Sequence, residues 1–365
     1  MRIVVYDIAA EDGGGLFVLK NFYDEVSKFF DKIEWTFIVS LNSFTNKDNV
    51  IVLTYKNVKV SWLHRLAFEK FQLPKILKKI NPDLIISLQN IPIPNCKYRQ
   101  FVYLHQSLQF CKKKFSFCKK EERNLAIRQR IICNYLYRKM LPSAAHIFVQ
   151  TNWIKKATED WITYPPSHIT VVPVKAENAR KFITDYTGQR SRTFFYPARA
   201  EIYKNHQVII QATKILISKG YTNFNIIFTM SPEENNYSNN IFKTAINLPI
   251  KFVGTLSYEL MWKYYSNTVL LFPSYLETCG LPLLEAKYAK GRILASDLPF
   301  SHEILDSYPN AQFFKFDDPI DLAEKMQEML DKPIYKNISE QYLSFGQNKT
   351  MGLAESMLEE VLWDE

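Results

Sequence analysis

The chain has 365 residues, of which 47% are hydrophobic and 23% charged, and its 46 Lys and Arg against 37 Asp and Glu give a net charge of +9. A chain of this length exceeds the usual size of one domain with a single hydrophobic core and is expected to form two domains. The composition excludes a disordered or fibrous chain. The basic balance favours an anionic partner, such as a nucleotide, an acidic membrane surface or a nucleic acid.

The sequence shows neither a membrane-spanning run nor a disulfide framework. Its five cysteines form no Cys-x-x-Cys pair, so we expect reduced thiols in a cytoplasmic protein. Residues 1–7 are a short apolar run that contains an acid, which is unlike a signal peptide. No stretch reaches the roughly 20 apolar residues that cross a bilayer.

Short apolar strands alternate with helical patterns through the first half of the chain. Strands are predicted at residues 3–6, 35–39, 84–87, 101–104 and 147–149. A loop of three glycines, Gly13, Gly14 and Gly15, precedes a helix predicted at residues 16–30. This alternation predicts an α/β domain over residues 1–175, with a parallel sheet covered by helices on both faces.

A polar and charged stretch, residues 176–192, is predicted to be the linker to a second α/β domain over residues 193–345. Its strands are predicted at residues 193–197, 224–228, 250–253, 269–272 and 292–295. Residues 346–365 are predicted to include a helix that packs back on the first domain. Two doubly wound sheets bind ligands at the carboxyl ends of their strands, so the loops after the strands are where chemistry is expected.

The most informative segment is Phe272-Pro-Ser-Tyr-Leu-Glu-Thr-Cys-Gly-Leu-Pro-Leu-Leu-Glu-Ala286, which follows a predicted strand. Pro282 fits the first turn of a helix, where its missing N–H group is not needed. Backbone N–H groups at this helix start favour an anion or sugar hydroxyl oxygens, and they belong to Thr278, Cys279, Gly280 and Leu281. Glu277 and Glu285 supply carboxylates that can accept hydrogen bonds from a diol.

This segment closely resembles the Glu-x7-Glu signature of the retaining glycosyltransferase family 4, with its Pro-Ser, Glu-x-x-Gly-Leu-Pro and Leu-Glu-Ala elements. The resemblance implies a GT-B fold, in which two Rossmann-like domains face a cleft and the second binds the donor. It also implies that Glu277 contacts the transferred sugar and that Glu285 contacts the ribose of the nucleotide.

Two further segments of the second half resemble the same family. The stretch from Tyr196 to His206 is similar to a strand-end element whose Arg and Lys bind the donor diphosphate, which assigns that role to Arg199 and Lys204. It departs from the family at Ala198 and Asn205, where glycine is common. Gly254 lies in a segment that resembles the loop near the nucleobase. The glycine-rich turn often found before it is replaced by Phe228-Thr-Met-Ser-Pro232, so the segment does not indicate which base is bound.

In the first half, Gly13, Gly14 and Gly15 resemble the family's glycine loop, whose backbone approaches the donor phosphate. His105 follows a predicted strand and resembles the histidine that contacts the sugar near its reacting carbon. An ordinary strand–helix turn and a structural histidine are the alternatives, and the other five histidines are interpreted as structural.

No Asp-x-Asp triplet occurs in the sequence, so we expect neither a catalytic metal site nor a cofactor. Arg199, Lys204 and backbone N–H groups are expected to stabilise the leaving diphosphate instead.

A basic stretch with interleaved apolar residues covers residues 111–140. One interpretation is an amphipathic helix on anionic lipid at the inner face of the membrane, and the other is an ordinary helix with a solvated basic face. The two are compatible.

The sequence therefore predicts a retaining, metal-independent glycosyltransferase that moves a sugar from a nucleotide-diphosphate sugar to a glycan or lipid-linked acceptor. A role in assembling a surface polysaccharide, such as O-antigen or capsule, is expected. A sugar-nucleotide epimerase of the same fold is the alternative. A nucleic-acid-binding protein is disfavoured because no motif of that class is present. A nicotinamide dehydrogenase is disfavoured because Gly-x-Gly-x-x-Gly spacing is missing.

Overall fold

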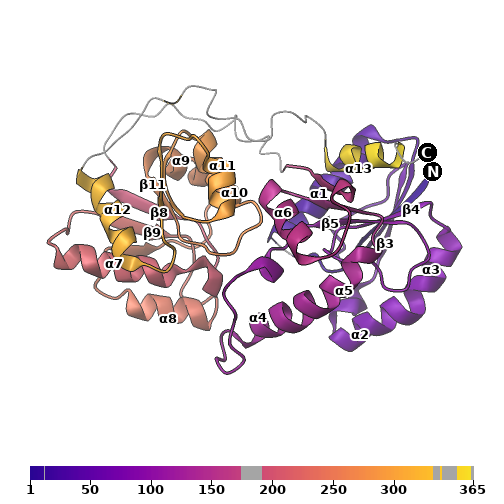
Figure 1. Cartoon of the computed structure of the whole chain (residues 1–365), viewed down its shortest axis with the longest axis horizontal. Helices are drawn as coiled ribbons and strands as arrows, with labels where there is room; N and C mark the ends of the chain where they lie inside the picture. The colour runs from indigo at the N-terminus through magenta and orange to yellow at the C-terminus, as the bar shows by residue number, and fades with distance from the viewer. Residues whose placement is uncertain (12, 174–190, 332–337, 339–351, 363–365) are drawn as a thin grey trace. The chain divides into compact units, whose positions relative to one another are not determined.

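The computed structural model describes residues 1–11, 13–173, 191–331, 338 and 352–362 (Figure 1). Most of the predicted linker, residues 176–190, and both ends of the predicted C-terminal segment lie outside the described residues. The chain divides into two compact units. The first comprises Met1–Gln109, Gln129–Pro173 and Asn348–Glu365, and the second comprises Phe110–Arg128 and Val174–Gln347.

The first unit is built on a seven-stranded sheet in the order β3-β2-β1-β4-β5-β6-β7, in which every neighbouring pair is parallel. Five of these strands are confirmed sequence predictions. The edge strands β3 and β7 were not predicted, because one is half exposed and the other is only three residues long. The strands are β1 (Arg2–Asp7), β2 (Glu34–Val39), β3 (Val50–Thr54), β4 (Leu84–Ser87), β5 (Gln100–Leu104), β6 (His146–Val149) and β7 (Ile169–Val171).

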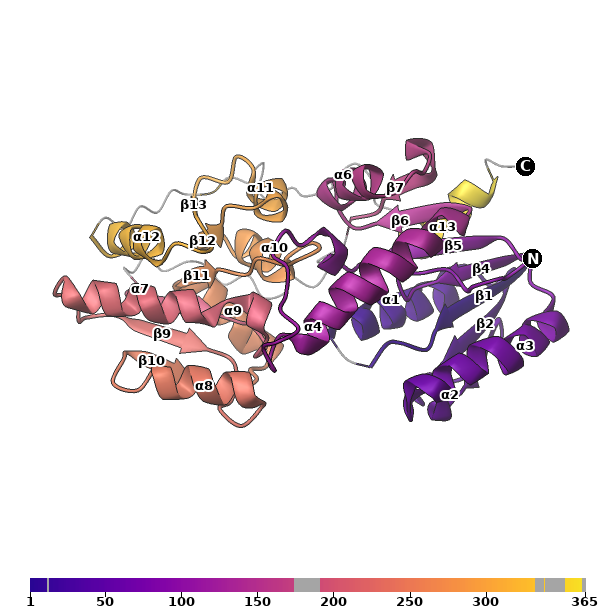
Figure 2. The same cartoon turned by 60° about the horizontal axis from the view of Figure 1, so that its bottom comes forward.

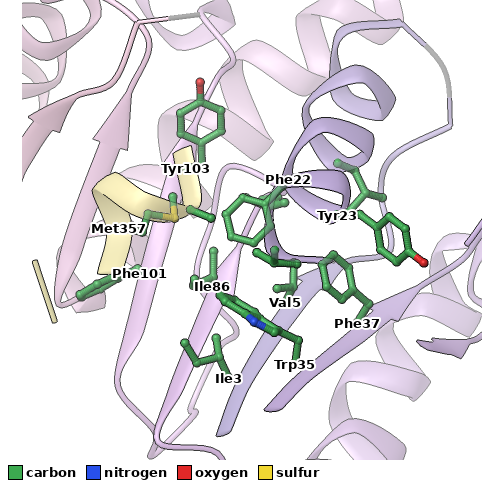
Figure 3. Close-up of a cluster of buried hydrophobic side chains, with 14 of the residues drawn as sticks. Ile3, Val5, Phe22, Tyr23, Trp35, Phe37, Ile86, Phe101, Tyr103 and Met357 are labelled. Carbon is green, nitrogen blue, oxygen red and sulfur yellow. The ribbon is translucent and has the colours of Figure 1, made fainter. Parts of the chain in front are cut away.

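Alternate side chains of these strands enter two different cores, because successive residues of a strand point to opposite faces. On one face, Ile3 and Val5 pack with Trp35, with α1 (Gly13–Phe29) and with α13 (Leu353–Leu362). Figure 3 shows Phe22 of α1 and Met357 of α13 directed at these strands, and the rings of Phe22 and Trp35 meet edge to face at 5.9 Å.

On the opposite face, Val4 and Tyr6 pack with Phe68, Leu73 and Leu77. These three side chains come from one continuous helix formed by α2 (Trp62–Ala67), a π-helical segment η2 (Phe68–Gln72) and α3 (Leu73–Ile80), which runs along one side of the sheet (Figure 2).

A second long helix covers residues 123–140. It consists of α4 (Arg123–Ile127), the π-helical segment η4 (Arg128–Tyr137) and α5 (Arg138–Met140). The basic stretch predicted at residues 111–140 is thus helical only from Arg123 onward. Residues 123–128 of this helix belong to the second unit and residues 129–140 to the first. The first unit further contains α6 (Asn152–Trp161) and the short 3₁₀ turns η1 (Lys56–Lys59), η3 (Leu108–Phe110), η5 (Leu141–Ser143) and η6 (Pro166–His168), of which Phe110 is already in the second unit.

The second unit is built on a six-stranded parallel sheet in the order β10-β9-β8-β11-β12-β13. Five strands match the predicted positions and β13 was not predicted. The strands are β8 (Thr193–Tyr196), β9 (Asn225–Phe228), β10 (Ile250–Phe252), β11 (Val269–Phe272), β12 (Arg292–Ser296) and β13 (Ala311–Phe314). The helices are η8 (Ile202–Lys204), α7 (His206–Ser218), α8 (Asn236–Thr244), α9 (Tyr258–Asn267), α10 (Leu281–Tyr288), α11 (Pro299–Leu305) and α12 (Pro319–Asp331). Helix α7 contacts α8 and α12, whereas α10 contacts α9 and α11, and the two groups lie on opposite sides of the sheet (Figure 1).

Both sheets confirm the predicted α/β class with two Rossmann-like parallel sheets. In each of them the strand order reverses beside the first strand of the unit, between β1 and β4 and between β8 and β11. Loops that leave the carboxyl ends of such strand pairs diverge and leave room for a ligand. No described helix is long and apolar enough to span a bilayer.

Candidate functional site

Most predicted site residues of the second unit lie in the loops that follow β8 and β11, on either side of its strand-order reversal, or at the start of α10. Lys204 ends the short helix η8 after β8, and Glu277 lies in the loop after β11. Their side chains form an ion pair with 2.5 Å between Nζ of Lys204 and Oε1 of Glu277, and the side chains are only 17% and 14% exposed. The structure therefore brings together two residues that are 73 positions apart.

Hydrogen bonds to backbone carbonyl oxygens fix the loop after β8 to its own strand and to the loop after β11. The hydroxyl of Tyr196 donates to the carbonyl oxygen of Lys204 at 2.6 Å. The N–H of Tyr275 and the hydroxyl of Ser274 both donate to the carbonyl oxygen of Tyr203, at 3.1 and 3.3 Å. The position of the Lys204–Glu277 pair is thus fixed by both loops.

The structure explains why asparagine stands at position 205, where glycine is common in the family. Its backbone is left-handed, with φ of 59°, a conformation that glycine and asparagine adopt more readily than other residues. Its side-chain amide donates to the carbonyl oxygens of Pro273 at 3.3 Å and Phe316 at 2.7 Å, so asparagine adds a tie between loops that glycine lacks.

Helix α10 begins as predicted, at Leu281 with Pro282 in its first turn, and Gly280 is its N-cap with φ of 71°. The carbonyl oxygen of Gly280 accepts from the N–H of Leu283 at 2.9 Å. Among the described residues, no acceptor is found for the backbone N–H groups of Cys279, Gly280 and Leu281. These groups and the helix dipole are suited to an anion or to hydroxyl oxygens.

Glu285 lies one turn into α10 and interacts with a different partner from that of Glu277. Its Oε2 accepts a hydrogen bond of 2.7 Å from the hydroxyl of Tyr265 in α9. Burial raises the pKa of Glu285 to about 7, and the Tyr265 hydrogen bond acts in the opposite direction. The carboxyl group therefore changes charge near neutral pH.

Cys279 and Arg199 occupy contrasting environments. Burial, with Glu303 and Glu277 nearby, raises the pKa of the Cys279 thiol to about 12, so the sulfur stays protonated and is a poor nucleophile. Arg199 is exposed just beyond β8, at the same edge of the sheet as Lys204. Thr278 and Leu281 are partly exposed beside them.

Gly254 lies farther along the sheet, after β10. Its φ is 68°, and a Cβ atom at this position would be 3.2 Å from the hydroxyl of Ser231, which follows β9. The loops after β9 and β10 are therefore close-packed at this point, and a side chain at Gly254 would be strained.

In the first unit, the predicted residues gather where the strand order reverses between β1 and β4. The three glycines are the first residues of α1 rather than a loop before it, and Gly13 has φ of 56°. An added Cβ at Gly15 would lie 3.8 Å from Cε1 of His105, whereas one at Gly14 would meet no atom within 4 Å. Gly15 therefore lies beside the ring of His105. No atom of the described residues occupies the space where a side chain at Gly14 would begin.

His105 is held in one orientation. Its backbone N–H donates to Oδ1 of Asn90 at 2.8 Å, and its ring stacks on Tyr103. Nε2 lies 2.8 Å from the carbonyl oxygen of Leu88. A carbonyl oxygen only accepts, so Nε2 carries the proton and Nδ1 is the acceptor. Burial lowers the pKa of His105, partly offset by the Leu88 carbonyl and by Asp7, which favours the neutral ring.

Several residues of these sites were not found from the sequence. Asp7 ends β1 and accepts from the N–H groups of Ala9 and Ala10 at 3.0 and 2.9 Å, and an acid closing an apolar strand was the available signal. No sequence motif marked Asn90 or Tyr265 as a site residue. Their roles depend on contacts with residues 15 and 20 positions away.

Residues 110–122, from the first half of the sequence, also reach the second unit. Phe115 is fully buried, and its ring lies 6.5 Å from that of Tyr275. Nζ of Lys113 lies 4.8 Å from the centre of the same tyrosine ring. Tyr275 is two residues before Glu277, so this segment packs against the loop that carries the ion pair.

No group of three His, Cys, Asp or Glu able to hold a metal ion is found in the part of the chain that the structure describes.

Comparisons with known proteins agree with this architecture. Residues 184–350 match the family model of glycosyl transferases group 1. A search of curated protein sequences gives no match. Among solved structures, sucrose-phosphate synthase from Thermosynechococcus elongatus is similar with a TM-score of 0.68 and 14% identity, over 100% of this chain and 98% of that one.

Two further solved structures are similar over 100% of both chains. The Anabaena protein HepE in complex with UDP-glucose has a TM-score of 0.64 and 12% identity. The UDP-GlcNAc 2-epimerase from Methanocaldococcus jannaschii has a TM-score of 0.52 and 16% identity. These similarities show the GT-B fold, and the family match supports a glycosyltransferase.

Proposed function

We propose that this protein is a retaining glycosyltransferase that moves a sugar from a nucleotide-diphosphate sugar to a glycan or lipid-linked acceptor. The observation that carries the proposal is the Lys204–Glu277 ion pair beside the start of α10, within the region that matches the family model. A structurally similar protein, HepE, is described in complex with UDP-glucose, which supports a nucleotide sugar as donor.

Each charged residue has a separate part in donor binding. Glu285 accepts hydrogen bonds from the ribose diol, and Glu277 accepts them from the hydroxyls of the transferred sugar. Arg199 and Lys204 bind the diphosphate. An ammonium group has three N–H donors, so Lys204 can hold Glu277 and a phosphate oxygen together. Cys279, Gly280 and Leu281 offer backbone N–H groups to the same ligand.

The transfer step follows from these assignments. The acceptor oxygen attacks the anomeric carbon on the face that the diphosphate leaves, the bond from that carbon to the phosphate oxygen breaks, and the departing oxygen takes the acceptor proton. Arg199 and Lys204 stabilise the growing negative charge, which is the main electrostatic contribution available to this site. The family resemblance assigns a contact with the sugar to the neutral ring of His105, and we propose that no metal ion takes part.

The wider role that we propose is a cytoplasmic step in assembling a surface polysaccharide on a lipid-linked or glycan acceptor. The family match favours transfer over epimerisation, whereas the fold itself is compatible with both, because an epimerase shares it.

A panel of UDP-, GDP-, ADP- and CMP-sugars tests the proposal. We expect one donor to raise the melting temperature, because a ligand that binds only the folded state stabilises it. With an acceptor added, nucleoside diphosphate should be released, EDTA should not reduce the rate, and NMR of the product should show the donor's anomeric configuration. Conversion of the donor sugar without an acceptor would identify an epimerase, and an inverted product would disprove retention.

A further inference from the structure

The helix from Trp62 to Ile80 leaves a large apolar surface open to solvent in the first unit. Its buried face supplies Phe68, Leu73 and Leu77 to the core. Its other face, with the turn before it, exposes five large side chains, here named the Trp62 surface: Val60 at 68%, Trp62 at 68%, Leu63 at 69%, Leu66 at 45% and Phe71 at 60%. Single exposed apolar residues are ordinary, but five within twelve positions form a surface that needs a partner.

The helix that carries this surface is firmly placed. Its N-cap is Ser61, whose hydroxyl accepts from the backbone N–H of His64 at 3.3 Å. Arg65 pairs with Glu69 at 3.1 Å and donates to Gln89 at 3.1 Å. The exposed residues are therefore presented by a fixed helix, whose opposite side is held in the core.

Charge around the surface is strongly one-sided. Residues 56–79 contain seven Lys and Arg and a single acid, Glu69, which gives a net charge of +6. Lys59 and Arg65 have acidic partners at Glu11 and Glu69. The other five lysines are exposed and form no ion pair with any described residue, and they are Lys56, Lys70, Lys75, Lys78 and Lys79.

We propose that the Trp62 surface binds the interface of an anionic lipid bilayer, with the apolar side chains inserted and the lysines at the headgroups. Tryptophan is well suited to this boundary, because its ring is amphipathic. Exposed lysines reach anionic headgroups while their stems lie on apolar surface. The helix lies in the plane of the membrane and does not cross it.

Charge argues against a second copy of this chain as the partner. A twofold interface sets the same patch against itself, which would bring the five unpaired lysines of one copy close to the five of the other. The anionic bilayer instead pairs these lysines with phosphate groups.

Part of the basic stretch at residues 111–140 has another role in the structure. Phe115 is buried, and Lys113 lies over the ring of Tyr275. Residues 110–122 are thereby part of the second unit. Exposed Ile131 and Tyr135 on the helix at residues 123–140 provide the internal comparison.

Sedimentation with lipid vesicles tests the proposal on the full chain, independently of any transferase activity. Vesicles of phosphatidylcholine alone are compared with vesicles that also contain phosphatidylglycerol, at low and high salt. Wild-type protein should bind only the anionic vesicles, and high salt should weaken binding because the lysines are exposed. The variant W62S/L63S/F71S should bind at least about tenfold more weakly, since three inserted side chains are lost. The variant K70Q/K75Q/K78Q/K79Q should lose binding to a similar extent.

Two comparisons make the result specific. The control F242S/I246S removes apolar side chains of comparable exposure from the second unit, 43% and 59%, and should bind like wild type. If W62S/L63S/F71S also binds like wild type, the proposal is wrong. If only I131S/Y135S loses binding, the membrane contact lies on the other helix and the proposal is wrong. A wild-type dimer without lipid that W62S/L63S/F71S dissociates would identify a subunit interface instead.

Discussion

At the scale of single residues, Glu285 couples folding to pH. The pKa of its buried carboxyl is raised from 4.5 to about 7. In the unfolded chain the group ionises at its ordinary value, whereas the folded chain retains the proton until about pH 7. The contribution of Glu285 to folding stability is therefore greatest at low pH, falls as the pH rises from 4.5 to about 7, and is constant above that.

Replacing Glu285 by Gln removes this titration. The melting temperature of the variant relative to wild type should rise across the same pH window, because only wild type must ionise a buried group. Donor nucleotide should bind about 10- to 100-fold more weakly at pH 8, since hydrogen bonds to a charged group contribute about 1.5–3 kcal/mol. Calorimetric titration measures this affinity. Tyr265→Phe is the control that keeps the carboxylate, and an unchanged affinity in Glu285→Gln would refute the ribose assignment.

The Lys204–Glu277 pair makes a second prediction. Glu277→Gln should lower kcat by about 100-fold or more while nucleotide affinity is retained, because the carboxylate contacts the sugar and not the nucleotide. Lys204→Met should lower both stability and kcat, since it leaves Glu277 charged, only 14% exposed and without its partner. Steady-state kinetics and thermal melting of each variant and of the double variant separate these effects. If the losses of stability in the two single variants add up in the double variant, Lys204 and Glu277 do not stabilise each other.

At the scale of elements, the two loops of the donor site depend on left-handed residues at their turns. Asn205 and Gly280 have φ of 59° and 71°, and each immediately precedes a helix. A β-branched residue at either place would be strained by about 1–2 kcal/mol. The turns are thus dictated locally, whereas the contact between them is made only by the folded sheet.

Residues 110–122 form the other element that shapes this site. Phe115→Ala should destabilise the second unit by about 3–5 kcal/mol, because it removes a fully buried ring that packs against Tyr275. Donor affinity should fall as well, since Tyr275 neighbours Glu277. Chemical denaturation and titration with the intact nucleotide sugar provide the two measurements. Phe117, which is 40% exposed, gives the matched control, and equal effects of Phe115→Ala and Phe117→Ala would contradict the packing role.

At the scale of the whole molecule, the chain does not follow a simple order of one domain after the other. Residues 110–128 belong to the second unit, and the C-terminal helix α13 belongs to the first. In α13, Ala354, Met357 and Val361 are buried against the strands and α1. The C-terminal helix is therefore part of the core of the first unit.

This arrangement predicts that a substitution near the C-terminus destabilises the N-terminal sheet. Met357→Ala should lower the stability of the first unit by about 2–5 kcal/mol, the usual effect of removing a buried methionine side chain. Hydrogen exchange should report faster opening of β1 and β2. The nearby Glu359→Ala leaves the buried face of α13 intact and should have little effect, and protection of β1 unchanged by Met357→Ala would contradict the docking.

The α/β class, ten of the strands and the start of α10 were predictable from the sequence alone. These features are local: buried parallel strands are short apolar runs, and a proline in the first turn with a preceding glycine marks a helix start. The resemblance to a glycosyltransferase family rested on the same short segments, and the family match covers residues 184–350, which include Glu277 and Glu285.

Which residues come into contact depends on the folded chain and could not be predicted from the sequence. Lys204 reaches Glu277 across 73 positions, and Lys113 reaches Tyr275 across 162. The strand order places the loops after β8 and β11 side by side, and no local pattern encodes that neighbourhood. Burial likewise set the pKa of Glu285, because desolvation depends on how much protein surrounds a carboxyl group and not on its neighbours in sequence. The edge strands β3, β7 and β13 were missed because β3 and β13 are partly exposed and β7 is only three residues long, so none of them is a long apolar run.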